Sequence, residues 1–267
     1  MVKSTSVLQL VSALLAVGVL NPQLTQTQFE HLSVVFSGSV AQAESLQAGL
    51  LALDQQLIDA VRSGDIQGVE IALNSGANVD AGNRYMGYPV AIATEQGNHR
   101  MVRLLVTNGA NVDVVSAGGQ TALGRAVDMG NLELVRILVN AGASPNRRTD
   151  YGVPLLYRAT EMGNLEVVRL LLQGGANANV QVSGTTALYR AVESGNIAIA
   201  RLLLAGDANP NQAAPLYRAV EVGNAELVRL LLDSGANPQI SQRGVSALSL
   251  AQTQGNRAIA TMLRQAM

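Results

Sequence analysis

The sequence predicts an all-α solenoid of seven helix-turn-helix units joined by finger loops. Two observations predict this fold class. First, a glycine followed by asparagine or aspartate recurs at spacings of 33, 33, 33, 32, 28 and 32 residues, a period typical of stacked repeats. Second, each period contains apolar residues at helical spacing. The glycines of these pairs are Gly64, Gly97, Gly130, Gly163, Gly195, Gly223 and Gly255.

The first 43 residues have the pattern of a secretory signal peptide. Lys3 precedes an apolar run of 14 residues, Val7–Leu20, and Ala41-Gln42-Ala43 supplies a small-x-small cleavage site. A membrane-spanning helix needs about 20 residues. We therefore predict cleavage after Ala43 and a mature chain that is periplasmic or secreted. An uncleaved membrane anchor is the alternative, because the segment is long for a signal and the polar patch Asn21–Gln28 interrupts it.

Residues 44–53 are expected to form a short leader, and residues 54–267 to form the repeat domain. In each unit the turn glycine stops the first helix, since it can adopt the left-handed conformation, and the next Asn or Asp caps the second helix. The second helix is clearest at Leu165–Leu172, with its apolar residues on one face. Glu166 and Arg169 lie three residues apart on the opposite side, which predicts a solvated pair on the outer surface.

The end of each second helix carries another landmark. A Gly-Ala pair follows the helix in five units, and Gly206-Asp207 holds the corresponding place in the unit of Gly195-Asn196. The loop after this landmark is also shorter in that unit, because Gly206 reaches Ala214 in 8 residues whereas Gly175 reaches Thr186 in 11. We expect a truncated finger there, since changes in loop length cost little free energy.

Three segments resemble the Thr-Pro-Leu-His-x-Ala opening of the ankyrin repeat, namely Thr186–Ala191, Pro215–Ala219 and Ser246–Ala251. The resemblance covers roughly Asp54 to the end of the chain and implies an ankyrin-repeat solenoid. The sequence departs from the family in having no histidine at the fourth position of this opening. Tyrosine stands there in three units, at Tyr157, Tyr189 and Tyr217, and we expect these side chains to be half-buried with hydroxyls in water.

Ankyrin arrays usually hold a protein partner on a concave surface made by the fingers and the first helices. The resemblance therefore implies a non-catalytic interaction module for a protein partner of unknown identity, acting as adaptor, inhibitor or stabiliser. The alternative function is a structural scaffold of the cell envelope, tethered by an uncleaved N-terminus. On this sequence the candidate contact residues of the concave face are Arg84, Tyr85, Tyr88, Glu95, Arg125, Asp128, Arg148, Tyr151, Arg158, Glu161, Arg190, Glu193, Arg218 and Glu221.

An arginine stands three residues before a carboxylate in four consecutive first helices, as at Arg158 and Glu161. Because stacking aligns equivalent positions, each carboxylate can reach arginines in its own unit and in a neighbour. The pairs are interpreted either as an ion-pair ladder that holds the repeats in register or as a charged floor for a partner's polar segment. Tyr85, Tyr88 and Tyr151 are predicted to lie in fingers and do not recur at one repeat position. They are therefore better contact candidates than the periodic tyrosines.

The composition argues against other function classes. A net charge of -1 offers no basic footprint for nucleic acid, and the chain has no cysteine. His99, the only histidine beyond the signal region, is expected at a surface or capping position, so few catalytic reagents remain. Asp80, Asp113 and Asp150 belong to different fingers, so they lack the close carboxylate spacing of a calcium-binding loop. Gly118-Gly119 lacks the following lysine of a phosphate-binding loop. We expect no cofactor, metal, nucleic acid or small-molecule substrate, and membrane contact only if the N-terminal segment is not cleaved.

Overall fold

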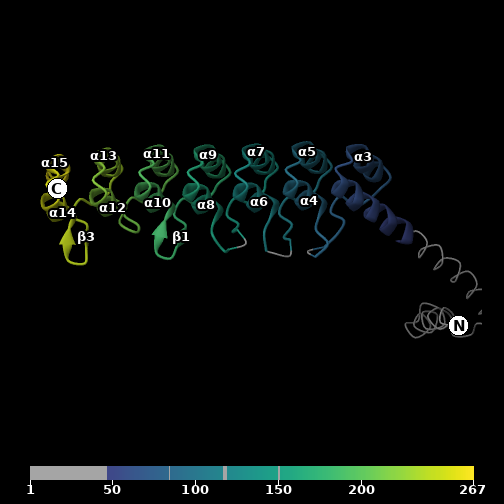
Figure 1. Ribbon diagram of the computed structural model, residues 1–267, viewed down its shortest axis with the longest axis horizontal. Helices are drawn as coiled ribbons and strands as arrows, with labels where there is room; N and C mark the ends of the chain where they lie inside the picture. The colour runs from purple at the N-terminus through teal and green to yellow at the C-terminus, as the bar shows by residue number, and fades with distance from the viewer. Residues whose placement is uncertain (1–46, 84, 117–118, 150) are drawn as a thin grey trace, which may run out of the picture.

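The computed structural model describes residues 47–83, 85–116, 119–149 and 151–267. Their helices pair into seven units that stack in a single row, with an outer layer of helices, an inner layer and fingers on the far side of the inner layer (Figure 1). No described helix is long and apolar enough to cross a membrane. The signal peptide predicted for residues 1–43 lies outside the described residues, as do Arg84 and Asp150.

Each unit contains an inner helix followed by an outer helix. In the first unit, residues 47–63 are helical and precede α3 (Ile66–Asn74). The later units pair α4 (Pro89–Glu95) with α5 (His99–Thr107), α6 (Ala122–Asp128) with α7 (Leu132–Asn140), α8 (Leu155–Glu161) with α9 (Leu165–Gln173), α10 (Ala187–Glu193) with α11 (Ile197–Ala205), α12 (Pro215–Glu221) with α13 (Ala225–Asp233), and α14 (Ala247–Thr253) with α15 (Arg257–Ala266).

Two fingers are short antiparallel hairpins. The finger before α10 pairs β1 (Gln181–Val182) with β2 (Thr185–Thr186), with Gln181 opposite Thr186. The finger before α14 pairs β3 (Ser241–Gln242) with β4 (Val245–Ser246) in the same register. The remaining fingers are loops that project on the same side of the row (Figure 1).

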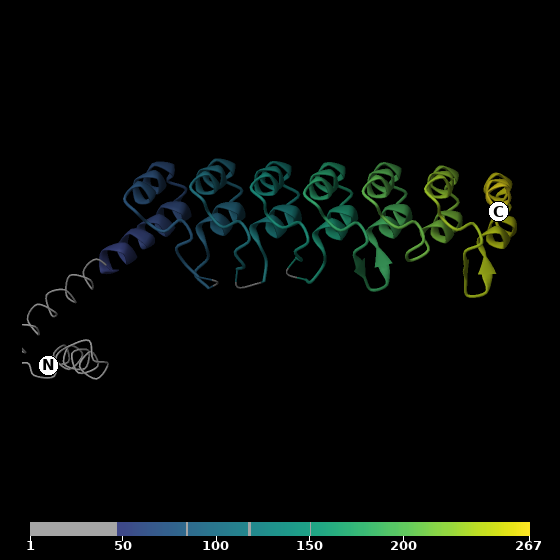
Figure 2. The same ribbon diagram turned by 180° about the vertical axis from the view of Figure 1, so that it is seen from behind.

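The helix at residues 47–63 crosses the boundary at which the sequence analysis placed the start of the repeat domain. Residues 47–53, part of the predicted leader, form the first turns of this helix. Leu57, Ile58 and Val61 are buried against the array, whereas Leu50 and Leu51 are exposed. Figure 2 shows that the N-terminal part of this helix projects beyond the row, so the helix extends past the residues that pack against the array.

Local capping explains where the outer helices begin. Gly163 has a φ of +68°, which a residue with a side chain adopts only at a cost. The next residue, Asn164, accepts a hydrogen bond from the backbone N–H of Val167 at 3.2 Å. Equivalent caps start every described outer helix, at Asp65, Asn98, Asn131, Asn164, Asn196, Asn224 and Asn256, which confirms the predicted role of these residues.

The core is a continuous layer of aliphatic side chains between the inner and outer helices. Outer-helix residues such as Leu138, Leu171 and Leu203 are fully buried, and so are inner-helix residues such as Leu155 and Leu188. Full burial of one such side chain contributes roughly 1.5–3 kcal/mol. Because each unit presents this surface to both neighbours, the array is stabilised unit by unit.

The fifth unit, α10 with α11, differs from the predicted landmark. Gly206 was expected to occupy the position of Gly175, but its φ is -98°, and Asp207 takes the left-handed conformation with a φ of +65°. The register is set by the next residue: Ala208, like Ala143, is buried at the junction between units. Aspartate can occupy this conformation because its short polar side chain tolerates it better than most.

The finger before α12 is truncated, as predicted. It contains no described strand, and two consecutive residues without the freedom of glycine, Ala213 and Ala214, have φ values of +63° and +56°. Since alanine enters the left-handed region at a cost of about 1–2 kcal/mol, this short connection is strained.

Candidate protein-binding face

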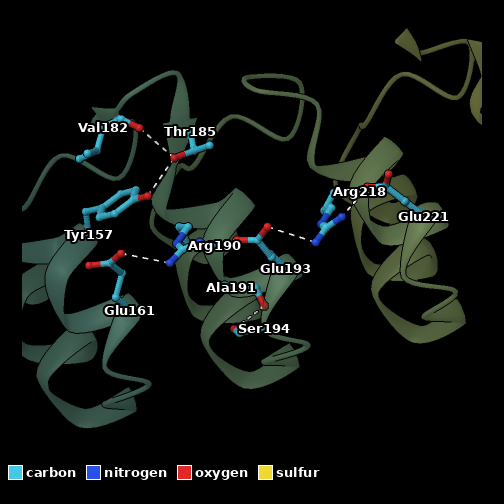
Figure 3. A network of polar contacts seen from close by, with 10 residues as sticks. All are labelled: Tyr157, Glu161, Val182, Thr185, Arg190, Ala191, Glu193, Ser194, Arg218 and Glu221. Carbon is cyan, nitrogen blue, oxygen red and sulfur yellow. Dashed lines mark hydrogen bonds and ion pairs between the residues drawn. The ribbon is translucent and has the colours of Figure 1, made fainter. Parts of the chain in front are cut away.

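The inner face consists of the fingers and the exposed side of the inner helices. Along it, carboxylates and arginines alternate across four successive units and form an ion-pair ladder, part of which Figure 3 shows. From the N-terminal end the pairs are Asp128–Arg158 at 3.0 Å, Arg158–Glu161 at 3.9 Å, Glu161–Arg190 at 3.1 Å, Arg190–Glu193, Glu193–Arg218 at 3.1 Å, and Arg218–Glu221. The stacking geometry therefore brings each arginine of the ladder between two carboxylates, as the spacing predicted.

Two of the ladder arginines have raised pKa values. For Arg190, burial alone would lower the pKa, but the electrostatic interaction with Tyr157, the hydrogen bond to Glu193 and the charges of Glu193 and Glu161 outweigh it. For Arg218, the hydrogen bond to Glu221 is the largest cause of the raised pKa. A guanidinium group is protonated at physiological pH even without such a shift, so the ladder keeps its alternation of charge.

The ladder begins at Asp128 and does not include Arg125, although the sequence predicted a pair between them. Asp128 binds Arg158 through Oδ1, and Oδ2 accepts a hydrogen bond from Nε2 of Gln120 at 2.7 Å. Both of its oxygens are thus occupied from other directions, and Arg125 is exposed and forms no ion pair with a described residue. Glu95 is also exposed without a described ion pair.

The periodic tyrosines are not equivalent. Tyr157 is only 5% exposed, and its hydroxyl lies 2.8 Å from Oγ1 of Thr185 in the next finger. Because the Thr185 hydroxyl donates to the carbonyl oxygen of Val182, the Tyr157 hydroxyl is the donor (Figure 3). The expectation of a half-buried ring with a solvated hydroxyl is wrong here, since the β1–β2 hairpin covers Tyr157. Tyr189 and Tyr217 are half-buried as expected.

The finger tyrosines separate into two kinds. Tyr85 and Tyr151 are 85% and 87% exposed, so almost the whole of each aromatic ring is offered to solvent. Tyr88 is half-buried and stands at the start of α4, immediately before Pro89. These two rings are the largest exposed apolar groups on the described fingers, which makes them the candidates for contact with another molecule.

A shallow hollow of about 330 Å³ lies between the finger before α6 and the finger before α8. We call it the basic hollow. Its lining residues are Val115, Gly119, Thr121, Asn146, Arg147, Arg148 and Thr149. A second hollow of about 250 Å³ lies on the ladder and is lined by Thr160, Glu161, Arg190, Glu193 and Ser194. Only the first of these is lined by arginines without a described carboxylate.

The sequence analysis missed a row of side chains that join the units at the base of the fingers. Oδ1 of Asn179 accepts the backbone N–H of Asn209 at 2.7 Å, and its Nδ2 donates to the carbonyl oxygen of Asp207 at 3.0 Å. Asn146 and Asn211 make the same two bonds to their next units. The recurring pattern Asn-x-Asn or Asn-x-Asp, with Ser144 in place of the first Asn before Asn146, could have revealed this junction clamp.

Two of the aspartates weighed as metal ligands belong to this clamp. Oδ1 of Asp80 accepts the backbone N–H of Asn111 at 2.9 Å, and Oδ1 of Asp113 accepts that of Ser144 at 3.1 Å. Among the described residues, no group of three or more potential metal ligands comes together. His99 is the first residue of α5 and is half-buried, and its Nε2 is 3.0 Å from Oδ1 of Asn131, the cap of α7 in the next unit; the cap of α5 itself is Asn98.

Stacked helix pairs with projecting fingers define a helical-repeat protein of the kind that presents an extended surface. A family model for ankyrin repeats (3 copies) matches residues 57–149 and 147–214, and a model for the single ankyrin repeat matches residues 211–242. The chain belongs to the ankyrin repeat family. Ankyrin repeats are generally non-catalytic modules of protein–protein interaction.

Three solved structures illustrate the similarity. An ankyrin repeat domain from Acinetobacter baumannii AYE is 29% identical, with a TM-score of 0.61 over 67% of this chain and 97% of that one. The ankyrin repeat domain of Bcl-3, a member of the IkappaB protein family, is 29% identical, with a TM-score of 0.64 over 78% and 97%. The human ASB11 ankyrin repeat domain is 26% identical, with a TM-score of 0.56 over 79% and 97%. No curated protein matches the chain.

Proposed function

We propose that this chain is an exported adaptor that binds a partner protein through its finger tips and the adjacent concave face. The observation that carries the proposal is the exposure of Tyr85 and Tyr151 on two fingers that project from the same side of the row. Tyrosine supplies a large contact area at a low cost in side-chain entropy and is enriched among residues that dominate binding energy.

The ion pairs of the ladder also favour contact through the fingers. Its arginines lie within 4 Å of carboxylates of their own chain, so a partner that used them would first have to break these pairs. We therefore assign the ladder to holding the units in register, and the fingers to contact. Of the contact residues predicted from the sequence, Tyr85, Tyr151 and Arg148 carry this function, with Arg125 and Glu95 available beside them.

Export is proposed from the pattern of residues 1–43, which would direct the mature chain to the periplasm or the exterior. N-terminal sequencing of the chain recovered from cell fractions tests it. A mature chain that begins at Glu44 in the periplasmic or secreted fraction is expected. An intact N-terminus in the membrane fraction would favour the tethered envelope scaffold instead.

The binding function is tested by affinity capture from a cell-envelope extract with the chain from Glu44 onward. The variant Tyr85→Ala/Tyr151→Ala is expected to lose a protein that the parent chain retains, while its helical circular dichroism is unchanged. The control Arg169→Ala/Arg201→Ala removes exposed side chains from the outer helices and should retain the same protein. Equal recovery by all three chains would contradict a binding site at the finger tips.

A further inference from the structure

We infer that the basic hollow receives an acidic segment of the partner protein, a refinement that rests on the proposed function. The finger before α8 contributes both Arg147 and Arg148 to the hollow, and it also carries the exposed Tyr151. The partner class follows from the chemistry of this surface: carboxylate side chains on an extended polypeptide, held by guanidinium groups and flanked by an aromatic ring.

The finger that carries these arginines is held in one conformation by its own hydrogen bonds. The backbone N–H of Thr149 donates to the carbonyl oxygen of Val153 at 2.8 Å, and Arg148 and Pro154 form an isolated antiparallel bridge. Thr149 itself is only 4% exposed. A preorganised finger loses less conformational entropy on binding than a loop that must be ordered first.

The guanidinium group of Arg148 is also positioned in advance. Its Nη1 donates to the carbonyl oxygen of Gly152 at 2.6 Å, which fixes the side chain against its own finger. A guanidinium group carries five N–H donors, so most of them remain for a ligand. Their planar fork matches the two oxygens of a carboxylate, which is why arginine suits this ligand better than a compact point charge would.

The charges around the basic hollow favour an anionic segment. The lining contains two arginines and no described Asp or Glu. Two described acidic residues of these units are engaged elsewhere, because Asp113 accepts from the backbone of Ser144 and Asp128 binds Arg158 and Gln120. Over Arg147–Tyr151 the sequence itself has two arginines and one aspartate, a net charge of +1.

The hollow on the ladder and a groove between two outer helices have a different electrostatic character. The hollow on the ladder pairs Arg190 with Glu161 and Glu193, and a groove of about 290 Å³ between α5 and α7 pairs Arg103 with Glu133. An incoming carboxylate would compete there with carboxylates already in place. A hollow of about 330 Å³ that is open to solvent suits one or two side chains of a bound segment, since enclosed ligand pockets start near this size.

The test uses three fluorescein-labelled peptides of equal length, rich in glutamate, glutamine or lysine, titrated against the exported chain and followed by fluorescence anisotropy. The glutamate peptide should bind at least about tenfold more tightly than the glutamine peptide in low salt and weaken as salt is added. The variant Arg147→Gln/Arg148→Gln should lose about tenfold in affinity for it. The matched control Arg201→Gln/Arg229→Gln removes the same charge from the outer helices and should change affinity less than twofold.

Equal binding of the glutamate and glutamine peptides, or equal losses in the two variants, would overturn the inference. Applying both arginine variants to the partner capture separates this result from the proposed function. If Tyr85→Ala/Tyr151→Ala releases the partner while Arg147→Gln/Arg148→Gln retains it, the adaptor function stands and the acidic segment is excluded. If the glutamate peptide binds the hollow but the tyrosine variant releases no partner, the finger-tip function fails by itself.

Discussion

Glu161 of α8 lies 3.1 Å from Arg190 of α10, which stands 29 residues further along the chain in the next unit. The same carboxylate also pairs with Arg158 of its own helix at 3.9 Å. Each carboxylate at an internal position of the ladder therefore links two units. Such a link resists a shift of one unit against the next, because the shift would separate opposite charges.

Replacing Glu161 with glutamine should lower the free energy of unfolding by about 0.5–1 kcal/mol, because the pairs are partly exposed and each arginine keeps a second carboxylate. Urea unfolding at low and high salt measures the loss, which should shrink as salt is added. The control Glu166→Gln breaks a pair within one outer helix and should cost less than about 0.5 kcal/mol. A double-mutant cycle with Arg190→Gln that shows no coupling would remove the ladder as a link between units.

Tyr157→Phe should lower the free energy of unfolding by about 1 kcal/mol, since it removes a buried hydrogen bond to Thr185 and retains the ring. Tyr189→Phe is the matched control. It is half-buried and has no described hydrogen bond from its hydroxyl, so we expect a change within about 0.5 kcal/mol. If the two variants melt alike, the contact between Tyr157 and the β1–β2 hairpin contributes nothing to stability.

Asp207→Gly should raise the free energy of unfolding by roughly 0.5–1 kcal/mol, because glycine enters the left-handed conformation without the steric cost that a side chain carries. Thermal melting by circular dichroism measures the change. The control Asp59→Gly makes the same replacement in the interior of the helix at residues 47–63, where glycine is a poorer helix former, and should lower the melting temperature. A lower melting temperature for Asp207→Gly would show that the aspartate side chain stabilises this turn.

Replacements of Asn179 should lower the free energy of unfolding by amounts that increase with the number of hydrogen bonds lost. Asn179→Asp keeps the oxygen that accepts from Asn209 but loses the donor to the carbonyl oxygen of Asp207, at a cost of about 1 kcal/mol. Asn179→Ala loses both bonds, so it should cost about 2 kcal/mol. The reverse change, Asp113→Asn, should raise the free energy of unfolding, because asparagine supplies the donor that aspartate lacks. An aspartate variant as stable as the parent would mean that the donor bond contributes nothing.

Much of the fold could be predicted because its signals are local. A turn glycine and the cap that follows it act within four residues, so their recurrence predicted the seven units and the start of each outer helix. The same locality explains one error. Gly206 looked like the landmark because it precedes Asp207, whereas the burial of Ala208 against a neighbouring unit set the register.

The candidate site was predicted only in outline. The spacing of Arg158 and Glu161 indicated that neighbouring units could share charges, but it could not tell that Gln120 and Arg158 would occupy Asp128 and leave Arg125 aside. Burial of Tyr157 depends on the finger of the following unit. Such contacts join residues about 30 positions apart, so their partners depend on how the units stack.

By itself, the sequence determined the repeat, its helices and their caps, because these are set by backbone preferences within one unit. It also determined which residue types line the inner face. Only the tertiary structure decided which charges neutralise one another, which tyrosine is covered, and that the described lining of the basic hollow holds arginines without a carboxylate. The physical reason is that ion pairs, burial and hollows are properties of the distances between units, and those distances exist only when the units are stacked.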